Sequence, residues 1–321
     1  MIVEINYLTY QQINKNKWDA CIDNADNGLI YAYSFYLDAM AKNWDALILN
    51  DYEAVMPLTW NKKYSIHYLY QPPFTACLGV FGKTLTAETI NSFLHAVPPK
   101  FKYWDIYFNH GNFFKLKDFE LYERMNYVLN LNSSYEKIYS GYRENIKRNI
   151  KKAEQLHLII NKNIALADVI ALAKEQARGF SDINETDFSN FENLYGLLNK
   201  KEKATTYGVY TKEKQLIASA VFLFSHNRAY YIMVGNHPNA RPNGSSGRSK
   251  TLGASHALIN AFIKDHAGEN LPDRQAGMLL DFEGSDIPSL AFFYSSFGAV
   301  EEKYSAVKLN KLPAPLKWLK K

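Results

Sequence analysis

The chain has 321 residues, of which 47% are hydrophobic and 21% are charged. This composition is that of a globular protein and excludes a disordered one, and the length suits two domains of about 150 residues each. The net charge of +5 favours anionic partners but is too small to indicate a DNA-binding protein, and the two cysteines exclude a disulfide framework and give no metal-ligand spacing.

The N-terminal segment and the hydropathy of the chain bear on its location. Residues 1–10 lack a basic region followed by a long apolar stretch, and no run approaches the ~18 apolar residues of a membrane span. We therefore expect an untargeted, cytoplasmic protein without stable membrane insertion.

The first half of the chain predicts strands and short helices. Within residues 45–60, Asn50-Asp51 separates two β-type runs, and both residue types tolerate a positive φ, so we expect a hairpin there. The linker-like stretch Asn132-Ser133-Ser134 places a domain boundary after residue 133 and gives domains 1–133 and 134–321. The expected helices are 31–42 and 87–96, and the expected strands are 1–7, 45–49, 52–60, 66–70, 102–109 and 123–131.

The second half opens with an amphipathic pattern that predicts one helix over residues 135–155. Apolar residues recur at helical spacing at Ile138, Tyr142, Ile146, Ile150 and Ala153. The other side carries Arg143, Lys147, Arg148, Lys151 and Lys152. A solvated basic face is the simpler interpretation. The alternative is that Arg143, Lys147 and Arg148 bind a phosphate group of the acceptor substrate.

The rest of the second half predicts an antiparallel meander followed by alternating helices and strands. The meander consists of three β-type runs joined by short turns, at 206–211, 215–225 and 228–235. A Gly/Ser/Asn-rich stretch covers 239–249. The other expected elements are a strand near 157–161, helices 165–179, 188–198, 253–266 and 287–297, a strand 278–282 and a final strand pair within 299–310.

This order of meander, glycine-containing loop, helix, strand, helix and strand resembles the second half of a GNAT acyltransferase domain. In that family, Arg or Gln, two residues, Gly, one residue and then Gly or Ala open a helix and wrap the pyrophosphate of acyl-CoA. Lys250, Gly253, Ala254 and Ser255 stand at the matching positions, with Lys250 and Ser255 departing from the pattern. Free N–H groups and small residues at a helix N-terminus suit an anion. A second register, 241–246, has the same spacing.

Other segments extend the resemblance. Residues 293–299 are similar to the GNAT motif in which a Tyr, here Tyr294, lies near the donor sulfur and protonates the leaving thiolate; Ile287 replaces the Asn common in that motif. Residues 142–155 and 281–294 resemble the Fem-like branch, which joins two GNAT domains and includes the aminoacyltransferases of peptidoglycan cross-bridges. The resemblance implies an α+β fold with a mixed, mostly antiparallel central sheet flanked by helices, in tandem duplicated GNAT domains.

Acyl transfer to an amine needs a base for the amine, a donor that polarises the carbonyl and an acid for the leaving thiolate. Glu283 follows a buried strand and is the expected base, and Tyr294 is the expected acid. A backbone N–H near Val234 or Gly235 is expected to polarise the carbonyl, because Gly235 permits a bulge in its strand.

Three more side chains are candidates near this site. Tyr231 and Asp281 are expected to contact the substrates, and capping of the following helix is the alternative for both Asp281 and Glu283. His256, in the first turn of the helix after Gly253, is a second candidate base, and a solvent-facing position is the simpler interpretation.

The resemblance implies an N-acyltransferase that takes acyl-CoA as donor, without a metal, and acts on a small-molecule or peptide-like amine between the two domains. A Fem-like transferase using aminoacyl-tRNA and acting on a peptidoglycan precursor is one alternative, disfavoured because the long helical arm of some members is not visible. A degenerate, non-catalytic GNAT pair that binds a ligand or partner is the other.

Overall fold

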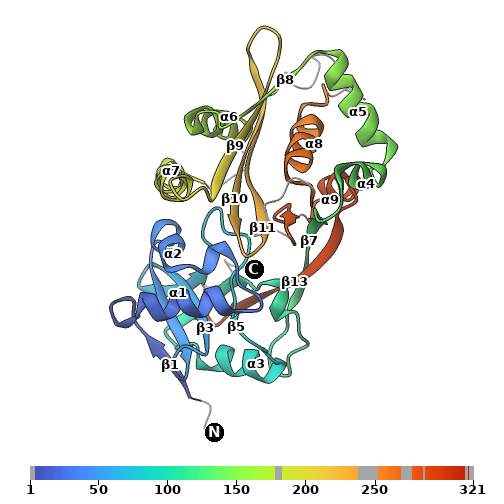
Figure 1. Ribbon diagram of the computed structural model, residues 1–321. Coiled ribbons are helices and arrows are strands. Elements are labelled where there is room, and N and C mark those ends of the chain that lie inside the picture. The colour runs from blue at the N-terminus through green and yellow to red at the C-terminus, as the bar shows by residue number, and fades with distance from the viewer. Residues whose placement is uncertain are drawn as a thin grey trace. The chain divides into compact units, whose positions relative to one another are not determined.

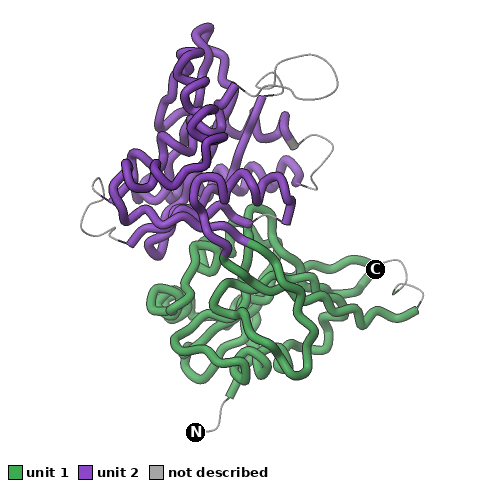
Figure 2. The backbone as a smooth tube through the Cα atoms, turned by 90° about the vertical axis from the view of Figure 1, so that its right-hand side faces the viewer, with its two compact units in different colours: residues 1–125, 302–321 green, residues 126–301 purple. Residues whose placement is uncertain are grey.

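The computed structural model describes residues 4–177, 183–237, 252–268, 277–284, 286–314 and 317. The chain forms two compact units (Figure 2). Unit 1 comprises residues 1–125 and 302–321, and unit 2 comprises residues 126–301. The division falls within two strands, β7 (Tyr122–Asn130) and β13 (Val300–Asn310).

Unit 1 is a mixed sheet with helices on its faces. Its strands follow the order β1-β2-β3-β4-β6-β13, with β5 beside β3; all pairs are antiparallel except β4 with β6. Its elements are β1 (Ile5–Leu8), η1 (Tyr10–Gln12), α1 (Lys15–Asn24), η2 (Ile30–Ala32), α2 (Ser34–Met40), β2 (Trp44–Leu49), β3 (Ala54–Lys63), β4 (Ile66–Tyr70), β5 (Phe81–Gly82), α3 (Ala87–Ala96), β6 (Phe101–Tyr107) and η3 (His110–Asn112).

Local sequence explains the best-predicted parts of unit 1. The β2–β3 hairpin forms as expected, and its turn places Asn50 at a φ of 47°. Helix α3 has the predicted bounds, because the Thr86 side chain accepts a hydrogen bond from the backbone N–H of Thr89 and so caps the first turn. Its apolar side, with Ile90 and Phe93, joins the core formed by the inner residues of β2, β3, β4 and β6.

Unit 2 has the strand order β7-β12-β11-β10-β9-β8, in which only β11 and β12 are parallel. The predicted meander is β9, β10 and β11. The elements after β7 are α4 (Tyr135–Ser140), α5 (Glu144–Gln155), β8 (Ile159–Lys162), α6 (Leu166–Ala177), α7 (Glu185–Asn199), β9 (Ala204–Tyr210), β10 (Leu216–Ser225), β11 (Arg228–Asn236), α8 (Ala254–His266), β12 (Leu279–Asp281) and α9 (Pro288–Ser295).

Helices cover both faces of the unit 2 sheet (Figure 1). Helices α6 and α7 lie on one face of β9–β11, α8 lies on the other, and α5 packs against α8. Aromatic stacking holds α8 to the sheet: the rings of Phe222 and Phe262 are 3.7 Å apart and nearly parallel, and Tyr207 meets both edge-on.

The two units repeat one order of elements. Each has a strand, two α-helices and three further antiparallel strands. A helix then leads to a last strand, which lies parallel to the third strand of that antiparallel set. In unit 1 the strand that flanks this parallel pair is β13, from the end of the chain, and in unit 2 it is β7, from the end of the first half. Unit 1 is thus completed by β13, which comes from the end of the chain, and unit 2 is completed by β7, which comes from the end of the first half. For this reason the two units do not correspond to a division of the chain after residue 133.

Three details of the predicted secondary structure were wrong. The single helix over 135–155 is two helices, because α4 ends at Gly141 and α5 begins after Arg143, although all five predicted apolar positions are buried. The final strand pair is the single strand β13. Helix α1 was not predicted; its buried residues are only Trp18 and Ile22, so its apolar side is too sparse to stand out.

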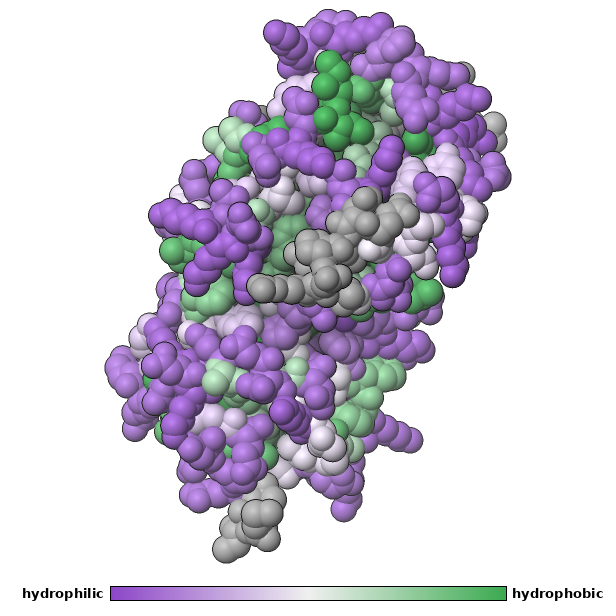
Figure 3. All heavy atoms as spheres, viewed as in Figure 1, coloured by the Kyte–Doolittle hydropathy of each residue, from purple (hydrophilic) through white to green (hydrophobic). Residues whose placement is uncertain are grey.

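The surface and the described helices give no indication of a bilayer-spanning segment. On the face drawn in Figure 3, hydrophilic residues predominate and hydrophobic residues form small separate groups. Within the described ranges, every helix is too short or too polar to cross a membrane.

Candidate active site

The candidate site lies where strands β11 and β12 of unit 2 diverge. Their parallel pairing covers Arg228 to Tyr230 on β11 and Leu279 to Asp281 on β12. Pairing of β11 with β10, in contrast, continues to Asn236. The second half of β11 therefore extends beyond its pairing with β12.

A β-bulge marks the same stretch of β11. Phe222 pairs with Tyr231 and Val221 pairs with Met233, so Ile232 is the extra residue. The bulge predicted at Gly235 is wrong in position, because Gly235 pairs regularly with Ser219. Gly235 is needed for another reason: a Cβ there would lie 2.8 Å from the backbone of α6, at Leu172 and Ala173.

Glu283 lies just past β12 in an unusual backbone conformation. Glu283 and Gly284 have φ angles of 63° and 85°, a left-handed pair that turns the chain away from the sheet. The residue is only partly buried, but its Oε1 atom is buried and has no hydrogen-bond partner among the described residues. Desolvation of the carboxyl raises the pKa of Glu283 well above its usual value. A raised pKa makes the ionised form of this carboxyl a stronger base than an exposed glutamate.

Three side chains hold the Glu283 turn in place. The Asp281 carboxylate accepts hydrogen bonds from the Glu283 backbone N–H at 2.8 Å and from Asn126 Nδ2 at 2.9 Å, and forms an ion pair with Arg228 at 2.7 Å. Asn126 Oδ1 accepts from the Gly284 N–H at 2.6 Å. These buried contacts fix both left-handed residues and so direct the Glu283 side chain.

This network bears on the predicted role of Asp281. Both carboxylate oxygens of Asp281 already have partners within the chain, which gives Asp281 a positioning role, and its contact with substrate stays a prediction. Asn126 and Arg228 were not predicted. No local signal could have found them, because Asn126 lies in the middle of β7 and Arg228 at the start of β11, and they meet Asp281 only in the folded sheet.

Aromatic residues surround Glu283. Tyr294, on α9, stacks on Phe282 with centroids 4.5 Å apart, and Tyr231, on β11, meets Phe282 edge-on at 6.0 Å. Burial, and then the nearby Glu283, raise the pKa of Tyr294 to about 12, and burial raises the pKa of Tyr231 well above its usual value. Both phenols are therefore protonated at neutral pH. The structure thus brings together three predicted residues: Tyr231, Glu283 and Tyr294.

The start of α8 lies close to α5. Gly253 caps α8 with a φ of 77°, and a Cβ there would be 2.2 Å from the Asn149 carbonyl oxygen of α5. Ala254 is buried. Ser255 donates a hydrogen bond of 2.5 Å to Asn236 Oδ1 at the end of β11. Gly253, Ala254 and Ser255 thus sit where the first turn of α8 meets the end of β11, and their binding of the donor stays a prediction. The predicted donor residue Lys250 and the second register 241–246 lie outside the described residues.

Further contacts hold the end of β11 in place. The backbone N–H of Asn236 donates to Gln176 Oε1 of α6 at 2.6 Å. Val234 is half-buried and pairs with Ala220. Its backbone stays a candidate for polarising the carbonyl, as does that of the bulged Ile232.

The three predicted basic residues of α5 do not converge on one point. The Arg143 guanidinium lies over the Phe292 ring of α9 at 5.0 Å. Lys147 forms an exposed ion pair with Glu144 at 3.2 Å, and Arg148 is exposed. This arrangement favours a solvated face, and phosphate binding by this face stays a prediction.

His256 does not face solvent, contrary to the simpler expectation. Its ring packs edge-on against Phe293 at 4.9 Å, and burial lowers the pKa of His256 to about 4. Across the described segments, no group of three or more His, Cys, Asp or Glu side chains is arranged to hold a metal ion.

Comparison with known proteins gives a family profile for part of unit 2. A sequence profile of the acetyltransferase (GNAT) domain matches residues 140–248. No curated protein sequence matches the chain significantly.

Solved structures resemble the whole chain. A crystal structure of FemX is similar with a TM-score of 0.64 and 14% identity, covering 99% of each chain. A conserved protein of unknown function from Bacteroides thetaiotaomicron is similar with a TM-score of 0.55 and 10% identity, over 96% of this chain and 100% of that one. L-PGS from Bacillus licheniformis has a TM-score of 0.50 and 10% identity, over 86% and 87%. At these identities the likeness concerns the fold.

Proposed function

The chain belongs to the GNAT acyltransferase superfamily and has the Fem-like fold, and we propose on this premise that unit 2 transfers an acyl group to an amine. The observation that carries the proposal is Glu283 Oε1, which is buried beside Tyr294 without a hydrogen-bond partner among the described residues, where β11 extends past β12.

The proposed reaction has three proton transfers, of which the last passes the second proton of the attacking nitrogen to the Tyr294 oxygen, directly or through a water molecule, as the neutral amide forms. Glu283 removes a proton from the acceptor ammonium, directly or through a water molecule, and the amine nitrogen then bonds to the acyl carbon. Backbone N–H groups of β11 near Ile232 or Val234 stabilise the oxyanion that forms. As the carbon–sulfur bond breaks, the thiolate takes a proton from the Tyr294 hydroxyl. The raised pKa of Tyr294 keeps that proton in place until the thiolate develops.

The first donor that we propose is acyl-CoA. The α8 N-terminus at Gly253, Ala254 and Ser255 offers backbone N–H groups and the positive end of the helix dipole to the pyrophosphate, with Lys250 as the added charge. Tyr231 and Asp281 are proposed to line and shape the acceptor site.

One observation favours a second donor. The Asn149 carbonyl oxygen of α5 lies against Gly253 and restricts the space beside the first turn of α8. An aminoacyl ester, as in aminoacyl-tRNA, does not need a pyrophosphate there. A Fem-like aminoacyl transfer to an amine of a peptidoglycan precursor is therefore the second candidate.

Calorimetry with CoA separates the two donors. Acyl-CoA transfer predicts saturable heat and a rise in melting temperature with CoA. No heat and no shift at about millimolar CoA would exclude this donor, since that corresponds to a binding free energy weaker than about −4 kcal/mol. Transfer from radiolabelled aminoacyl-tRNA to an amine panel then tests the second candidate.

Substitution of the proposed base tests catalysis itself. Glu283→Gln keeps the size of the side chain and should lower kcat about 10²- to 10⁴-fold while leaving donor binding unchanged. Tyr294→Phe should lower kcat less with an activated thioester, whose thiolate needs little help to leave. Glu192→Gln, on the exposed side of α7, is the control. Donor binding without turnover in the unmodified protein would instead support the non-catalytic alternative.

A further inference from the structure

Unit 1 contains a pocket built around a buried carboxylate, far along the chain from the residues of the candidate active site. The pocket has a volume of about 400 Å³ and is lined by residues of η1, of α2, β2 and their connection, and by Trp60 of β3 and Lys100. This size suits a small metabolite. Nothing in the acyl-transfer proposal uses it.

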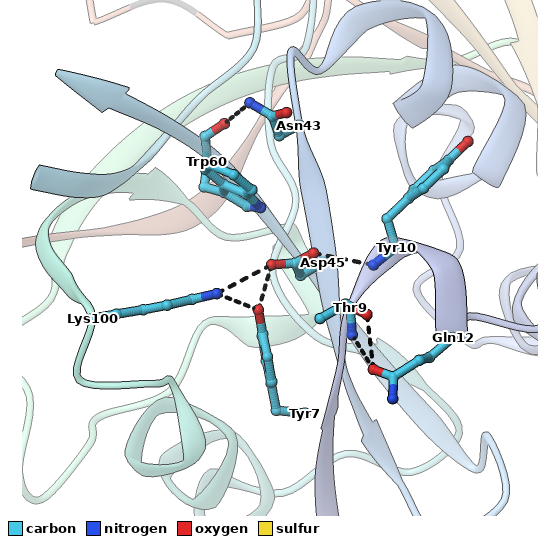
Figure 4. Close-up of polar contacts among 8 residues, drawn as sticks. All are labelled: Tyr7, Thr9, Tyr10, Gln12, Asn43, Asp45, Trp60 and Lys100. Atoms are coloured by element: carbon cyan, nitrogen blue, oxygen red, sulfur yellow. Dashed lines mark hydrogen bonds and ion pairs between the residues drawn. The ribbon is translucent and has the colours of Figure 1, made fainter. Parts of the chain in front are cut away.

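Asp45 organises the pocket (Figure 4). Its side chain is 6% exposed, and it accepts hydrogen bonds from the Tyr7 hydroxyl and, at 3.1 Å, from the Tyr10 backbone N–H. Lys100 Nζ lies 3.6 Å from the same carboxylate and donates to the Tyr7 hydroxyl at 2.6 Å. The Asp45 charge is therefore compensated within the protein, and its lone pairs are engaged.

The second carboxylate of the pocket is compensated in the same way. Asp38 forms an ion pair with Lys15 at 2.7 Å and accepts from the Trp44 indole N–H at 3.1 Å. Counting Lys42 and Lys100 as well, three ammonium groups face two carboxylates, which leaves a charge of +1 at this site.

The polar groups of the pocket that can still form hydrogen bonds to a ligand are N–H donors. Trp60 Nε1 is buried and makes no hydrogen bond to any described residue. Lys100 has three N–H donors, of which the contacts with Tyr7 and Asp45 engage two, and its side chain is 41% exposed. Lys42 is exposed at the rim, and its ammonium has no ion-pair partner within the described part of the chain.

The Trp60 N–H is the sharpest sign of a missing partner. A buried N–H without an acceptor costs about 1–3 kcal/mol, so native proteins rarely leave one unpaired. The other indoles that the structure describes all have acceptors: Trp18 donates to the Ala32 carbonyl, Trp44 to Asp38 and Trp104 to the Phe101 carbonyl. Trp60 lies beside Asp45 and Lys100 on the wall of the pocket (Figure 4).

We propose that this pocket binds a small molecule through an oxyanion group, a carboxylate or a phosphate, which accepts from Trp60 Nε1, Lys100 Nζ and Lys42 Nζ. A cationic ligand does not fit, because the carboxylates already have partners. Aromatic rings around Lys100, at 4.8 Å for Tyr7 and 5.8 Å for Trp60, hold the ammonium in position and leave an apolar wall for the rest of the ligand.

Indole NMR tests the proposal on the whole chain. The five tryptophans give separate Nε1–H signals, and Trp60→Phe identifies the one from Trp60. Titration with sodium acetate and with sodium phosphate, against sodium chloride at equal ionic strength, should move the Trp60 signal along a saturable curve in the range of about 1–10 mM. The hydrogen-bonded indoles of Trp18 and Trp104 should not move. Saturation with acetate alone identifies a carboxylate site, and with phosphate alone a phosphate site.

Charge variants decide whether the shift reports this pocket. Lys100→Gln should weaken binding about tenfold or more, and Lys42→Gln, at the exposed rim, should weaken it a few-fold without affecting folding. Lys117→Gln removes an exposed charge elsewhere in unit 1 and should change nothing. If neither anion moves the Trp60 signal beyond the chloride control, or if Lys42→Gln binds as the unmodified protein does, the proposal is wrong.

Discussion

Replacement of Gly253 by Ala should destabilise unit 2 strongly, because two separate effects act at this position. The residue caps α8 at a φ of 77°, where an L-residue with a Cβ costs about 1–2 kcal/mol more than glycine. The new Cβ would also lie 2.2 Å from the Asn149 carbonyl oxygen, and atoms of this kind do not approach within 3.0 Å. Helices α5 and α8 must therefore separate by at least the difference, 0.8 Å.

The expected loss follows from these two effects. Overpacking of a rigid interface costs about 1–3 kcal/mol, so Gly253→Ala should lower the free energy of unfolding by roughly 2–5 kcal/mol in total. Gly196→Ala is the matched control. Gly196 lies in α7, with nothing within 4 Å of a Cβ built there, so alanine should raise stability by about 0.5–1 kcal/mol through its helix propensity.

Urea denaturation followed by far-UV circular dichroism measures both variants. All five tryptophans belong to the residue ranges of unit 1, so fluorescence recorded in the same experiment follows unit 1 by itself. Equal stability of the two variants would refute the argument, because it would mean that α5 does not pack on the N-terminus of α8 as described.

Three further predictions follow from the strand order, the Glu283 turn and the buried His256. Separate expression of the chain before and after the predicted boundary should give two poorly folded products, because each unit lacks its completing strand, β13 or β7; a well-dispersed NMR spectrum of either half would contradict this. Asn126→Asp places a second carboxylate against Asp281, and its charge should raise the pKa of Glu283 by repulsion. The acidic limb of the pH–kcat profile should therefore move to higher pH by about one unit. A limb at the same pH would contradict the role of Asn126 in positioning Glu283. Because burial lowers the pKa of His256 to about 4, the unfolded state binds a proton at a higher pH than the folded state does, and stability should fall as the pH drops from about 6.5 towards 4. His256→Leu should lessen this fall, measured as the difference between the urea midpoints at pH 7 and pH 5. An unchanged difference would contradict the prediction.

Glu283 should affect stability in the opposite direction. Its pKa is raised in the folded state, so its contribution is fully present below the unfolded value of about 4.5 and declines as the pH rises towards the folded value. Glu283→Gln should be less sensitive to pH over that window. The same burial that raises the pKa of this carboxyl therefore lowers the stability of unit 2 as the pH rises above the unfolded value.

Much of the fold was determined locally and could be predicted from the sequence. The bounds of α3 follow from its capping Thr86, and the meander β9–β11 follows from apolar β-type runs with short turns. The start of α8 was predicted from the resemblance of residues 250–255 to the GNAT donor loop, and glycine suits the left-handed φ of 77° found at Gly253. Glu283 was identified because it follows a short apolar strand, a relation between neighbours in the chain.

Other features were decided by contacts between distant segments. The break between α4 and α5 leaves the apolar spacing intact, so periodicity could not show it. The positions of β7 and β13 depend on which sheet edge each strand meets, and every β-type run carries the same local signal whichever edge it joins.

The environments that give side chains their chemistry were likewise set by the tertiary structure. Asn126 contacts the Glu283 turn at Gly284, which lies 158 positions further along the chain. The unpaired indole of Trp60 and the buried carboxylate of Asp45 are ordinary residues in the sequence, and only packing removes water from them. The sequence by itself therefore determined most of the elements and where a carboxylate follows a strand. Burial, which shifts a pKa or leaves an N–H without a partner, depends on the surrounding atoms, and those come from all parts of the chain.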